Sequence, residues 1–218
     1  MSDAENNKPE GGGLNRRSFL KSAGVAVAGG TLSAGVAMTA PQSAEAAVPV
    51  QSPTAPVPGL TRPVATKLNV NGKDVDVVIE AHWTLQRTLQ FRLGLTGAKQ
   101  MCDRGACGSC TVIIDGRAVL SCTMLAIECE GKKIETVEGI AADPKWKPLI
   151  DSYCKWDAMQ CGYCTPGFVV SAKALLDKNP RPTEEDCRQA LAGNICCCGT
   201  YPRHPTAIVE AAGIMRSA

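Results

Sequence analysis

Four cysteines in the middle of the chain have the spacing of a metal-cluster site. They follow the pattern Cys-x4-Cys-x2-Cys-x11-Cys, at Cys102, Cys107, Cys110 and Cys122. The Cys-x4-Cys-x2-Cys core is the plant-type spacing for a 2Fe–2S cluster, which four thiolates hold. Gly105 and Gly108 fit this chemistry, because a loop that points backbone N–H groups at cluster sulfurs needs close approach and positive φ. Zinc is the alternative, but zinc sites favour two cysteine pairs at short spacing, so the pattern predicts an iron–sulfur cluster.

A second group of cysteines is less specific by its spacing alone. It consists of Cys161-x2-Cys164 and the three adjacent cysteines at 196–198. A single Cys-x2-Cys pair is also typical of a redox motif or of half a zinc site. A helix is expected to begin at Pro166, directly after the pair, and another to end at Gly193, directly before the triplet. Two helix ends would then meet at one site, and a helix N-terminus favours an anionic thiolate cluster.

The remaining cysteines and the two histidines receive no ligand role. Cys129, Cys154 and Cys187 are interpreted as small buried hydrophobes or free thiols. His82 lies ahead of the first expected helix and is given no role. His204 could lie near the second cysteine group, but a surface position is favoured.

The first 46 residues have the features of an export signal. Arg16-Arg17 is followed by Phe-Leu-Lys, then by a Gly- and Ala-rich stretch over 22–40, and then by Ala44-Glu45-Ala46. This order predicts a bacterial twin-arginine signal, export to the periplasm by the twin-arginine machinery, and cleavage after Ala46. The alternative is a disordered N-terminus with a chance arginine pair. The stretch over 22–40 is too weakly apolar for a stable membrane span.

Export makes disulfides the competing interpretation of the cysteines. There are 12 cysteines among 218 residues, and all of them follow residue 46. The remaining chain of about 170 residues can bury a core without many cross-links. Proteins that use the twin-arginine route are carried folded, often with a cofactor inside, so the signal favours clusters over six disulfides. The formal net charge of +2, without a concentrated basic patch, makes no case for nucleic-acid binding.

Two folding regions follow a proline-rich segment at 47–65, which is interpreted as a linker. Residues 66–140 predict strands around one helix, with hairpin turns at Asn71-Gly72 and Asp115-Gly116, a helix capped by Thr84, and a last strand over 134–137. Residues 141–218 predict helices alone. These are expected at 144–153, 166–176, 183–192 and 205–215, the third opening on a Thr183–Asp186 capping box. The fold class is therefore α+β, and each region holds one cysteine group.

Taken together, these residues resemble the iron–sulfur small subunit of the xanthine oxidase family of molybdenum hydroxylases. The resemblance covers roughly residues 66–212. It rests on the segments Leu93–Gly97, Cys102–Val112, Gln160–Gly167 and Gly193–Cys196. With the export signal, the chain is most similar to the iron–sulfur subunits of periplasmic aldehyde oxidoreductases.

The resemblance implies a β-grasp, ferredoxin-like domain followed by a four-helix domain, each with one 2Fe–2S cluster. The ligands it implies are Cys102, Cys107, Cys110 and Cys122 for the first cluster, and Cys161, Cys164, Cys196 and Cys198 for the second. Gln160 matches the residue that contacts the pterin in this family. The implied partners are a large subunit with the molybdopterin and the substrate site and, often, a subunit that binds FAD. No catalytic residue is expected in this chain.

One position departs from the family pattern. Cys197 stands where the family usually has arginine, between the last two ligands. The loss of this cation is expected to lower the potential of the second cluster or to weaken subunit contact. The expected function is that of an oxidoreductase's electron-transfer subunit, passing electrons from molybdopterin in a partner through two clusters to flavin or another acceptor. The alternative is a stand-alone two-cluster carrier, which would need neither Gln160 nor a proline-rich segment.

Overall fold

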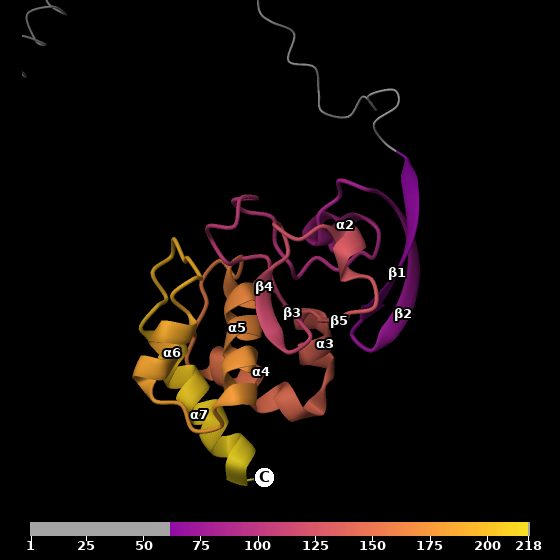
Figure 1. Ribbon diagram of the computed structural model, residues 1–218. Coiled ribbons are helices and arrows are strands. Elements are labelled where there is room, and N and C mark those ends of the chain that lie inside the picture. Colours follow the sequence, from indigo (N-terminus) through magenta and orange to yellow (C-terminus); the bar gives the residue numbers. More distant parts are fainter. Residues whose placement is uncertain (1–61, 218) are drawn as a thin grey trace, which may run out of the picture. The chain divides into compact units, whose positions relative to one another are not determined.

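The computed structural model of this protein describes residues 62–217 (Figure 1). All of these residues belong to one compact unit. The predicted export signal and cleavage site lie outside the described residues. So does the predicted linker, except for its last residues. Strand β1 begins at Pro63, so residues 63–65 belong to the sheet rather than to a linker.

The first half of the described chain forms a mixed five-stranded sheet. Its strands are β1 (Pro63–Val70), β2 (Lys73–Glu80), β3 (Thr111–Ile114), β4 (Arg117–Leu120) and β5 (Lys133–Glu135), in the spatial order β2-β1-β5-β3-β4. Strands β1 and β5 pair parallel, and the other pairs are antiparallel. Both predicted hairpins are confirmed, with Asn71 and Asp115 at positive φ ahead of their glycines.

Helix α2 (Leu85–Phe91) contributes to the apolar core of this sheet. The Thr84 side chain accepts a hydrogen bond from the backbone N–H of Arg87 at 3.3 Å, which confirms the predicted cap. Leu85 and Leu89 are fully buried on the face that meets the sheet. A continuous apolar core joins them to residues from four of the strands, among them Leu68, Ile79, Val112 and Ile134.

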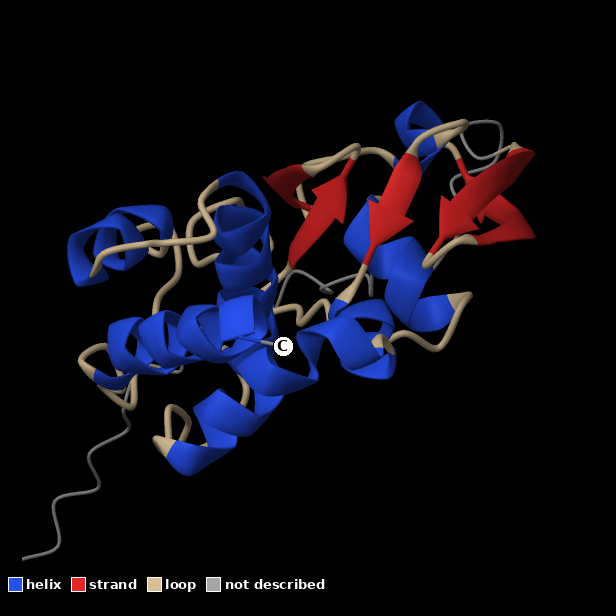
Figure 2. Ribbon diagram, turned by 90° about the horizontal axis from the view of Figure 1, so that it is seen from below, coloured by secondary structure: helices blue, strands red, loops and turns tan. Residues whose placement is uncertain are grey.

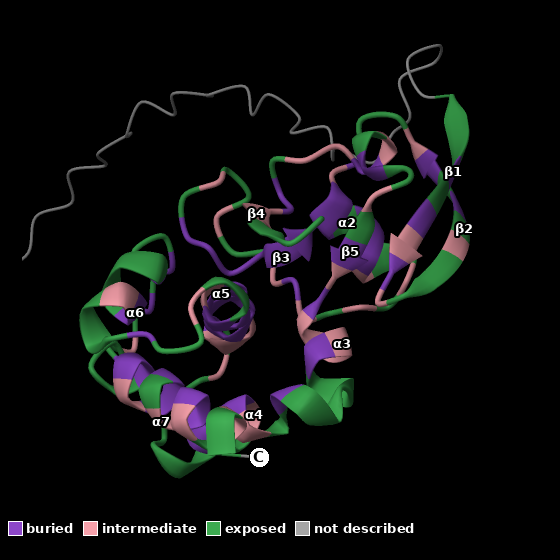
Figure 3. Cartoon of the chain, turned by 60° about the horizontal axis from the view of Figure 1, so that its bottom comes forward, coloured by how far each residue is buried: buried purple, intermediate pink, exposed green. Residues whose placement is uncertain are grey.

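The second half is helical, as predicted. Its helices are α3 (Val137–Ala142), α4 (Lys147–Lys155), α5 (Thr165–Lys178), α6 (Glu184–Ala190) and α7 (Arg203–Ser217). Figure 3 shows α5 almost end-on and buried, with α4, α6 and α7 around it. The strands and most of the helices therefore occupy different sides of the unit (Figure 2). Among residues 62–217, no helix is long and apolar enough to cross a membrane.

The boundary between the two halves differs from the sequence prediction. The last strand was expected to reach residue 137, but it ends at Glu135, and Val137 begins α3. The cause is a contact between residues distant in sequence. The Thr136 N–H donates to Asn71 Oδ1 at 2.8 Å, so it does not pair with a neighbouring strand. The helix expected from Pro144 begins with one 3-10 turn over Pro144–Trp146 before α4. A further 3-10 turn, Ala126–Cys129, was not predicted.

Candidate metal centres

The first cysteine group lies in the loop between α2 and β3. Three of its members are carried by this single loop, and the β3–β4 hairpin returns Cys122 to it. The return is fixed by Ser121, whose backbone N–H and hydroxyl both donate to the Cys110 carbonyl, at 3.3 and 2.6 Å. The thiols face one another in pairs, Cys102 with Cys107 and Cys122 with Cys110. The structure thus brings together all four residues of the first predicted set.

Backbone N–H groups of this loop point at the sulfurs. Gly105 N–H donates to Cys122 Sγ and Ala106 N–H to Cys102 Sγ, both at 3.3 Å. The loop turns through positive φ at Asp103, Gly105 and Gly108, which is how successive N–H groups come to share one side. Hydrogen bonding from the Arg104 backbone lowers the pKa of Cys102 to about 6, whereas burial raises the pKa of Cys122 to about 12. A concave loop of N–H donors that favours thiolate suits an anionic cluster.

The second group is assembled from two segments at helix ends. Cys161 and Cys164 directly precede α5, and the cysteines at 196–198 follow α6. The thiols again face one another in pairs, Cys161 with Cys198 and Cys164 with Cys196. All four residues of the second predicted set therefore lie close together. Helix α5 begins beside them, with its N-terminus next to Cys164.

The electrostatics of this second group repeat those of the first. Hydrogen bonding from the Tyr163 backbone lowers the pKa of exposed Cys161, whereas burial raises the pKa of Cys164 to about 12. At Cys196 burial acts in the same direction, but hydrogen bonds from Thr200 outweigh it and lower the pKa to about 7. Each group therefore combines buried thiols with a thiol that ionises readily.

The pairing of the thiols bears on the kind of metal site. Among residues 62–217, no three His, Cys, Asp or Glu side chains converge as they would around a single ion. A structural zinc site needs four such ligands at one point. A 2Fe–2S cluster instead holds two irons, each with two protein ligands, so two pairs of thiols are the donor set it requires. The four pairs fit two 2Fe–2S clusters.

The cysteines outside the two groups behave as isolated residues. All 12 cysteines are free thiols, so no disulfide competes with the clusters. Cys129 and Cys187 are fully buried, as small hydrophobes are, whereas Cys154 lies exposed on α4. Cys197 is also exposed, between its two paired neighbours.

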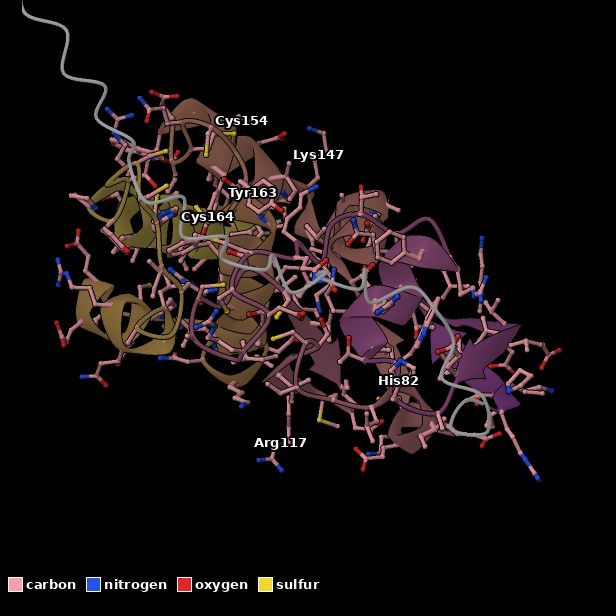
Figure 4. All side chains as sticks on the ribbon, turned by 90° about the horizontal axis from the view of Figure 1, so that it is seen from above. His82, Arg117, Lys147, Cys154, Tyr163 and Cys164 are labelled. Carbon is pink, nitrogen blue, oxygen red and sulfur yellow. The ribbon has the colours of Figure 1, made fainter. Side chains whose placement is uncertain are left out.

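The two histidines occupy opposite environments. His82 is exposed in the sheet half, beside Glu80 and far from Cys164 (Figure 4). The surface position favoured for His204 is wrong, because this side chain is only 1% exposed inside the helical core. It shares the apolar face of α7 with Ala207, Ile208 and Ala211. That i, i+3, i+4, i+7 spacing was the signal in the sequence that could have located it.

The surface beside the second group is exposed. Gln160 is exposed immediately before Cys161, and Tyr163 is 45% exposed. The Tyr163 hydroxyl donates to the Gln100 carbonyl of the first loop at 2.5 Å. Figure 4 shows Tyr163 beside Cys164, on the helical side of the unit. The residue predicted to contact a pterin thus lies on a face that a second molecule can reach.

The two groups are joined directly through backbone. The N–H of Ile195 donates to the carbonyl of Cys107 at 2.9 Å, which links a residue of the first group to the neighbour of Cys196. Next to it, Asn194 Nδ2 donates to the Gly108 carbonyl at 3.0 Å while Asn194 Oδ1 accepts from Ser171 at 2.9 Å. We call this contact, made by Cys107, Gly108, Asn194 and Ile195, the backbone bridge.

Small residues and a buried cation hold the bridge in place. A Cβ on Gly167 of α5 would lie 2.3 Å from the Gly108 carbonyl oxygen, so only glycine allows this approach. A second link comes from Lys173 of α5, which reaches Glu135 of β5 and Asp177, both at 2.7 Å. The Lys173 side chain is only 8% exposed whereas Glu135 is 42% exposed, so the cation is buried and its pair with Glu135 links α5 to the sheet.

Comparison with known proteins agrees with this architecture. A family described as a 2Fe-2S iron-sulfur cluster binding domain matches residues 61–155, and one described as a 2Fe-2S binding domain matches residues 136–209. A twin-arginine translocation signal sequence matches residues 13–33. The two cluster families together cover both cysteine groups.

Three individual proteins show the extent of the likeness. The aldehyde oxidoreductase iron-sulfur-binding subunit PaoA of Escherichia coli is 35% identical over 94% of this chain and 90% of its own. The nicotinate dehydrogenase small FeS subunit of Eubacterium barkeri is 44% identical over 63% of this chain and 88% of its own. The crystal structure of quinoline 2-oxidoreductase from Pseudomonas putida 86 has a chain that superposes with a TM-score of 0.68 at 37% identity, covering 72% of this chain and 98% of that one.

These relatives combine the two domain types seen here, in the same order and over nearly their whole length. The sequence identity with PaoA extends through both halves of the described structure and into the export signal. With two paired thiol groups, two matching cluster domains and these relatives, the chain belongs to the iron–sulfur subunits of the xanthine oxidase family of molybdenum hydroxylases.

Proposed function

We propose that this chain is the electron-transfer subunit of an exported molybdenum hydroxylase. We further propose that the substrate of the whole enzyme is an aldehyde. The observation that carries the proposal is the backbone bridge, in which one 2.9 Å hydrogen bond connects the two cysteine groups. A subunit that relays electrons needs two closely coupled redox groups, whereas two independent structural sites do not. The aldehyde substrate rests on the resemblance to PaoA, since the substrate site would belong to a partner subunit.

The residues that would hold the first cluster are Cys102, Cys107, Cys110 and Cys122, and those for the second are Cys161, Cys164, Cys196 and Cys198. When bound, each 2Fe–2S cluster accepts and releases one electron at a time. The chain's own contribution is to fix the distance between the groups, to donate backbone N–H groups to the sulfurs, and to bury seven of the eight thiols in whole or part. Cys107 and Cys110 are nearly inaccessible to water, which protects the thiolates of the first group.

The exposed face beside the second group is where a molybdopterin-binding large subunit would dock. Gln160 and Cys161 are both exposed there, and Tyr163 supplies an aromatic contact surface. The Gln160 amide has donors and an acceptor for a pterin edge. The partner at the other end, a subunit that binds FAD or another acceptor, would receive electrons from the side of the first group.

Export of the folded protein is the remaining part of the proposal. The signal match at 13–33 supports the twin-arginine route to the periplasm. Cleavage after Ala46 rests on the small-x-small pattern of Ala44-Glu45-Ala46. We divide the chain into a signal at 1–46, a proline-rich linker at 47–65, a ferredoxin-type domain at 66–140 and a helical domain at 141–218. The bounds of β1 and α3 support moving the second and third boundaries to about Pro63 and Thr136.

Electron paramagnetic resonance of the dithionite-reduced protein tests the cluster assignment. Two distinct signals are expected from the unmodified chain, with about four irons and four sulfides for each polypeptide. Cys110→Ser should remove one signal and Cys164→Ser the other, because each change deletes one ligand of one set. Cys154→Ser is the matched control, since Cys154 is a free thiol on α4 outside both groups.

Co-purification decides between a subunit and a stand-alone carrier. A tagged chain should be recovered from the periplasm with a molybdopterin-containing partner, and Gln160→Ala should weaken that association while leaving both signals in place. Recovery of the tagged chain alone, with both signals present, would favour the carrier instead. A single signal in the unmodified chain would remove one of the clusters from the proposal.

A further inference from the structure

A buried polar chain leads away from the second cysteine group into the helical core. Cys196 Sγ lies 3.2 Å from Thr200 Oγ1, and Thr200 Oγ1 lies 3.0 Å from His204 Nε2. Thr200 is 8% exposed and His204 is 1% exposed, so both polar groups have left water. Buried polar side chains need partners, and here the partner at the end of the chain is a cluster ligand.

The direction of these hydrogen bonds follows from the chemistry of the ligand. As a cluster ligand, Cys196 is a thiolate and can only accept, so the Thr200 hydroxyl must donate to it. The Thr200 oxygen is then free to accept, which requires the hydrogen of His204 to lie on Nε2. The other ring nitrogen, Nδ1, is left as a bare acceptor, and this buried atom has no hydrogen-bond partner among residues 62–217.

The ring of His204 is held in one orientation by its neighbours. It stacks on Phe168 of α5 with ring centroids 4.0 Å apart and planes 7° from parallel. Tyr153 of α4 packs against it with centroids 5.5 Å apart. Burial lowers the pKa of His204 to about 4, so near pH 7 the imidazole is neutral and carries a single N–H, which the hydrogen bond to Thr200 places on Nε2.

From this geometry we infer that Thr200 and His204 are positioning residues that raise the reduction potential of the second cluster by donating a fixed hydrogen bond to Cys196. The inference rests on the proposed function, because it takes Cys196 to be a ligand. A hydrogen bond to a ligand sulfur stabilises the reduced, more negative form of a cluster over the oxidised form. His204 contributes because its Nε2–H donates to the Thr200 oxygen. This leaves the hydroxyl hydrogen of Thr200 pointing at the Cys196 sulfur.

The test is a redox titration of the full, cluster-loaded protein followed by electron paramagnetic resonance. Thr200→Val keeps the side-chain shape and removes the donor. At a fixed solution potential it should lower the reduced-to-oxidised ratio of the second cluster about tenfold, a shift of about 59 mV to lower potential for a one-electron couple. The first cluster serves as an internal reference, because the hydrogen bonds of the Thr200 side chain go to Cys196 and His204, and its midpoint should stay unchanged.

Two further variants separate tuning from folding. Thr200→Ser keeps the hydroxyl and should retain the unmodified potential. His204→Phe keeps a flat ring against Phe168 but removes the Nε2 hydrogen, so it should shift the second cluster in the same direction by a smaller amount. If Thr200→Val fails to load its second cluster, His204→Phe decides: an unshifted midpoint overturns the inference.

The outcomes distinguish this inference from the proposed function. Two signals with an unshifted second midpoint in Thr200→Val would overturn the inference and leave the electron-transfer assignment in place. An absent second signal in the unmodified protein would overturn both. A shift of both midpoints together would also count against the inference, because it would mean a general change in packing rather than a bond to Cys196.

Discussion

The two cysteine groups reach the same donor set by different routes. The first group is almost entirely local, because one loop of nine residues carries three thiols and its shape comes from positive φ at Asp103, Gly105 and Gly108. The second group is built by tertiary packing, because its two segments lie more than thirty residues apart and meet only where α5 and α6 pack. The first site therefore depends on backbone conformation, and the second on the stability of the helical core.

The difference matters because the two sites are not independent. The backbone bridge fastens the loop that carries Cys107 to the segment that carries Cys196. Its residues have little room, since Gly108 and Gly167 meet backbone to backbone. A locally specified site and a site that depends on packing thus share one contact, and the contact is where a mutation should affect both.

The largest effect should come from Gly167→Ala, which places a methyl group 2.3 Å from the Gly108 carbonyl oxygen. Backbone on both sides cannot yield easily, so we expect a loss of about 2–4 kcal/mol in the free energy of unfolding. Both paramagnetic signals should weaken, even though Gly167 belongs to the helical half. Gly213→Ala in α7 is the control, because its Cβ meets nothing within 4 Å, and it should stabilise by at most about 1 kcal/mol.

Loss of the second paramagnetic signal alone in Gly167→Ala would contradict the view that the two cysteine groups depend on one contact. It would mean that the first loop keeps its shape without the bridge, and that the two sites are mechanically separate. Iron content measured on the same samples distinguishes this outcome from a general loss of folded protein.

A matched pair of helix caps should have an intermediate effect. Thr84 caps α2 in the sheet half, and Thr183 caps α6 in the helical half through a reciprocal box with Asp186. Replacing either threonine by alanine should lower the free energy of unfolding by about 1 kcal/mol. Because Ile113 of β3 is buried in the helical core, we expect one cooperative transition in both variants.

Denaturant unfolding followed by circular dichroism and by the visible absorbance of the clusters measures this. Coincident curves in both variants are the expected result. If Thr183→Ala moved the helical signal and left the sheet signal in place, the two halves would be separate folding units, and the bridge would carry little stability.

Much of the fold was accessible from local sequence signals. The hairpins at Asn71-Gly72 and Asp115-Gly116 were predicted because both turns need positive φ, which these residue pairs supply. The Thr183–Asp186 box was predicted for the same reason, since both of its hydrogen bonds lie within four residues. The first thiol group was predicted from spacing because three of its members lie in one loop, whereas the second was predicted with the help of the resemblance, because its two segments lie more than thirty residues apart.

What could not be predicted depends on contacts between distant residues. The end of β5 is set by Asn71 reaching Thr136, a contact across 65 residues, so the apolar run from Ile134 looked like a longer strand. The bridge joins Asn194 to Gly108 across 86 residues. The spacing of apolar residues along α7 could have shown that His204 is buried, but its stacking on Phe168 and Tyr153 depends on two other helices.

The smallest expected effect is a dependence of the free energy of unfolding on pH, which arises from His204 in the helical half. Burial lowers the pKa of His204 from 6.5 to about 4 in the folded protein. Between these two values the unfolded chain binds more protons than the folded chain, so the free energy of unfolding decreases as the pH is lowered. Between pH 7 and pH 6 this amounts to about 0.5–1 kcal/mol. Tyr153 beside it stays neutral, because burial raises its pKa.

His204→Phe should flatten this dependence, whatever its effect on stability at pH 7. The measurement is the free energy of unfolding of both proteins at pH 7 and pH 6. Exposed His82 is present in both proteins, so any contribution from it is the same in each. An equal pH dependence in the two proteins would show that His204 is not the group responsible.

The backbone bridge also bears on how two clusters would be loaded into one chain. A cofactor bound at either cysteine group immobilises backbone that forms one wall of the other, because Ile195 and Cys107 are hydrogen-bonded to each other. The second insertion then has less conformational entropy to remove than the first, which makes loading positively cooperative. When iron is scarce, chains with both clusters or none should therefore outnumber those with one.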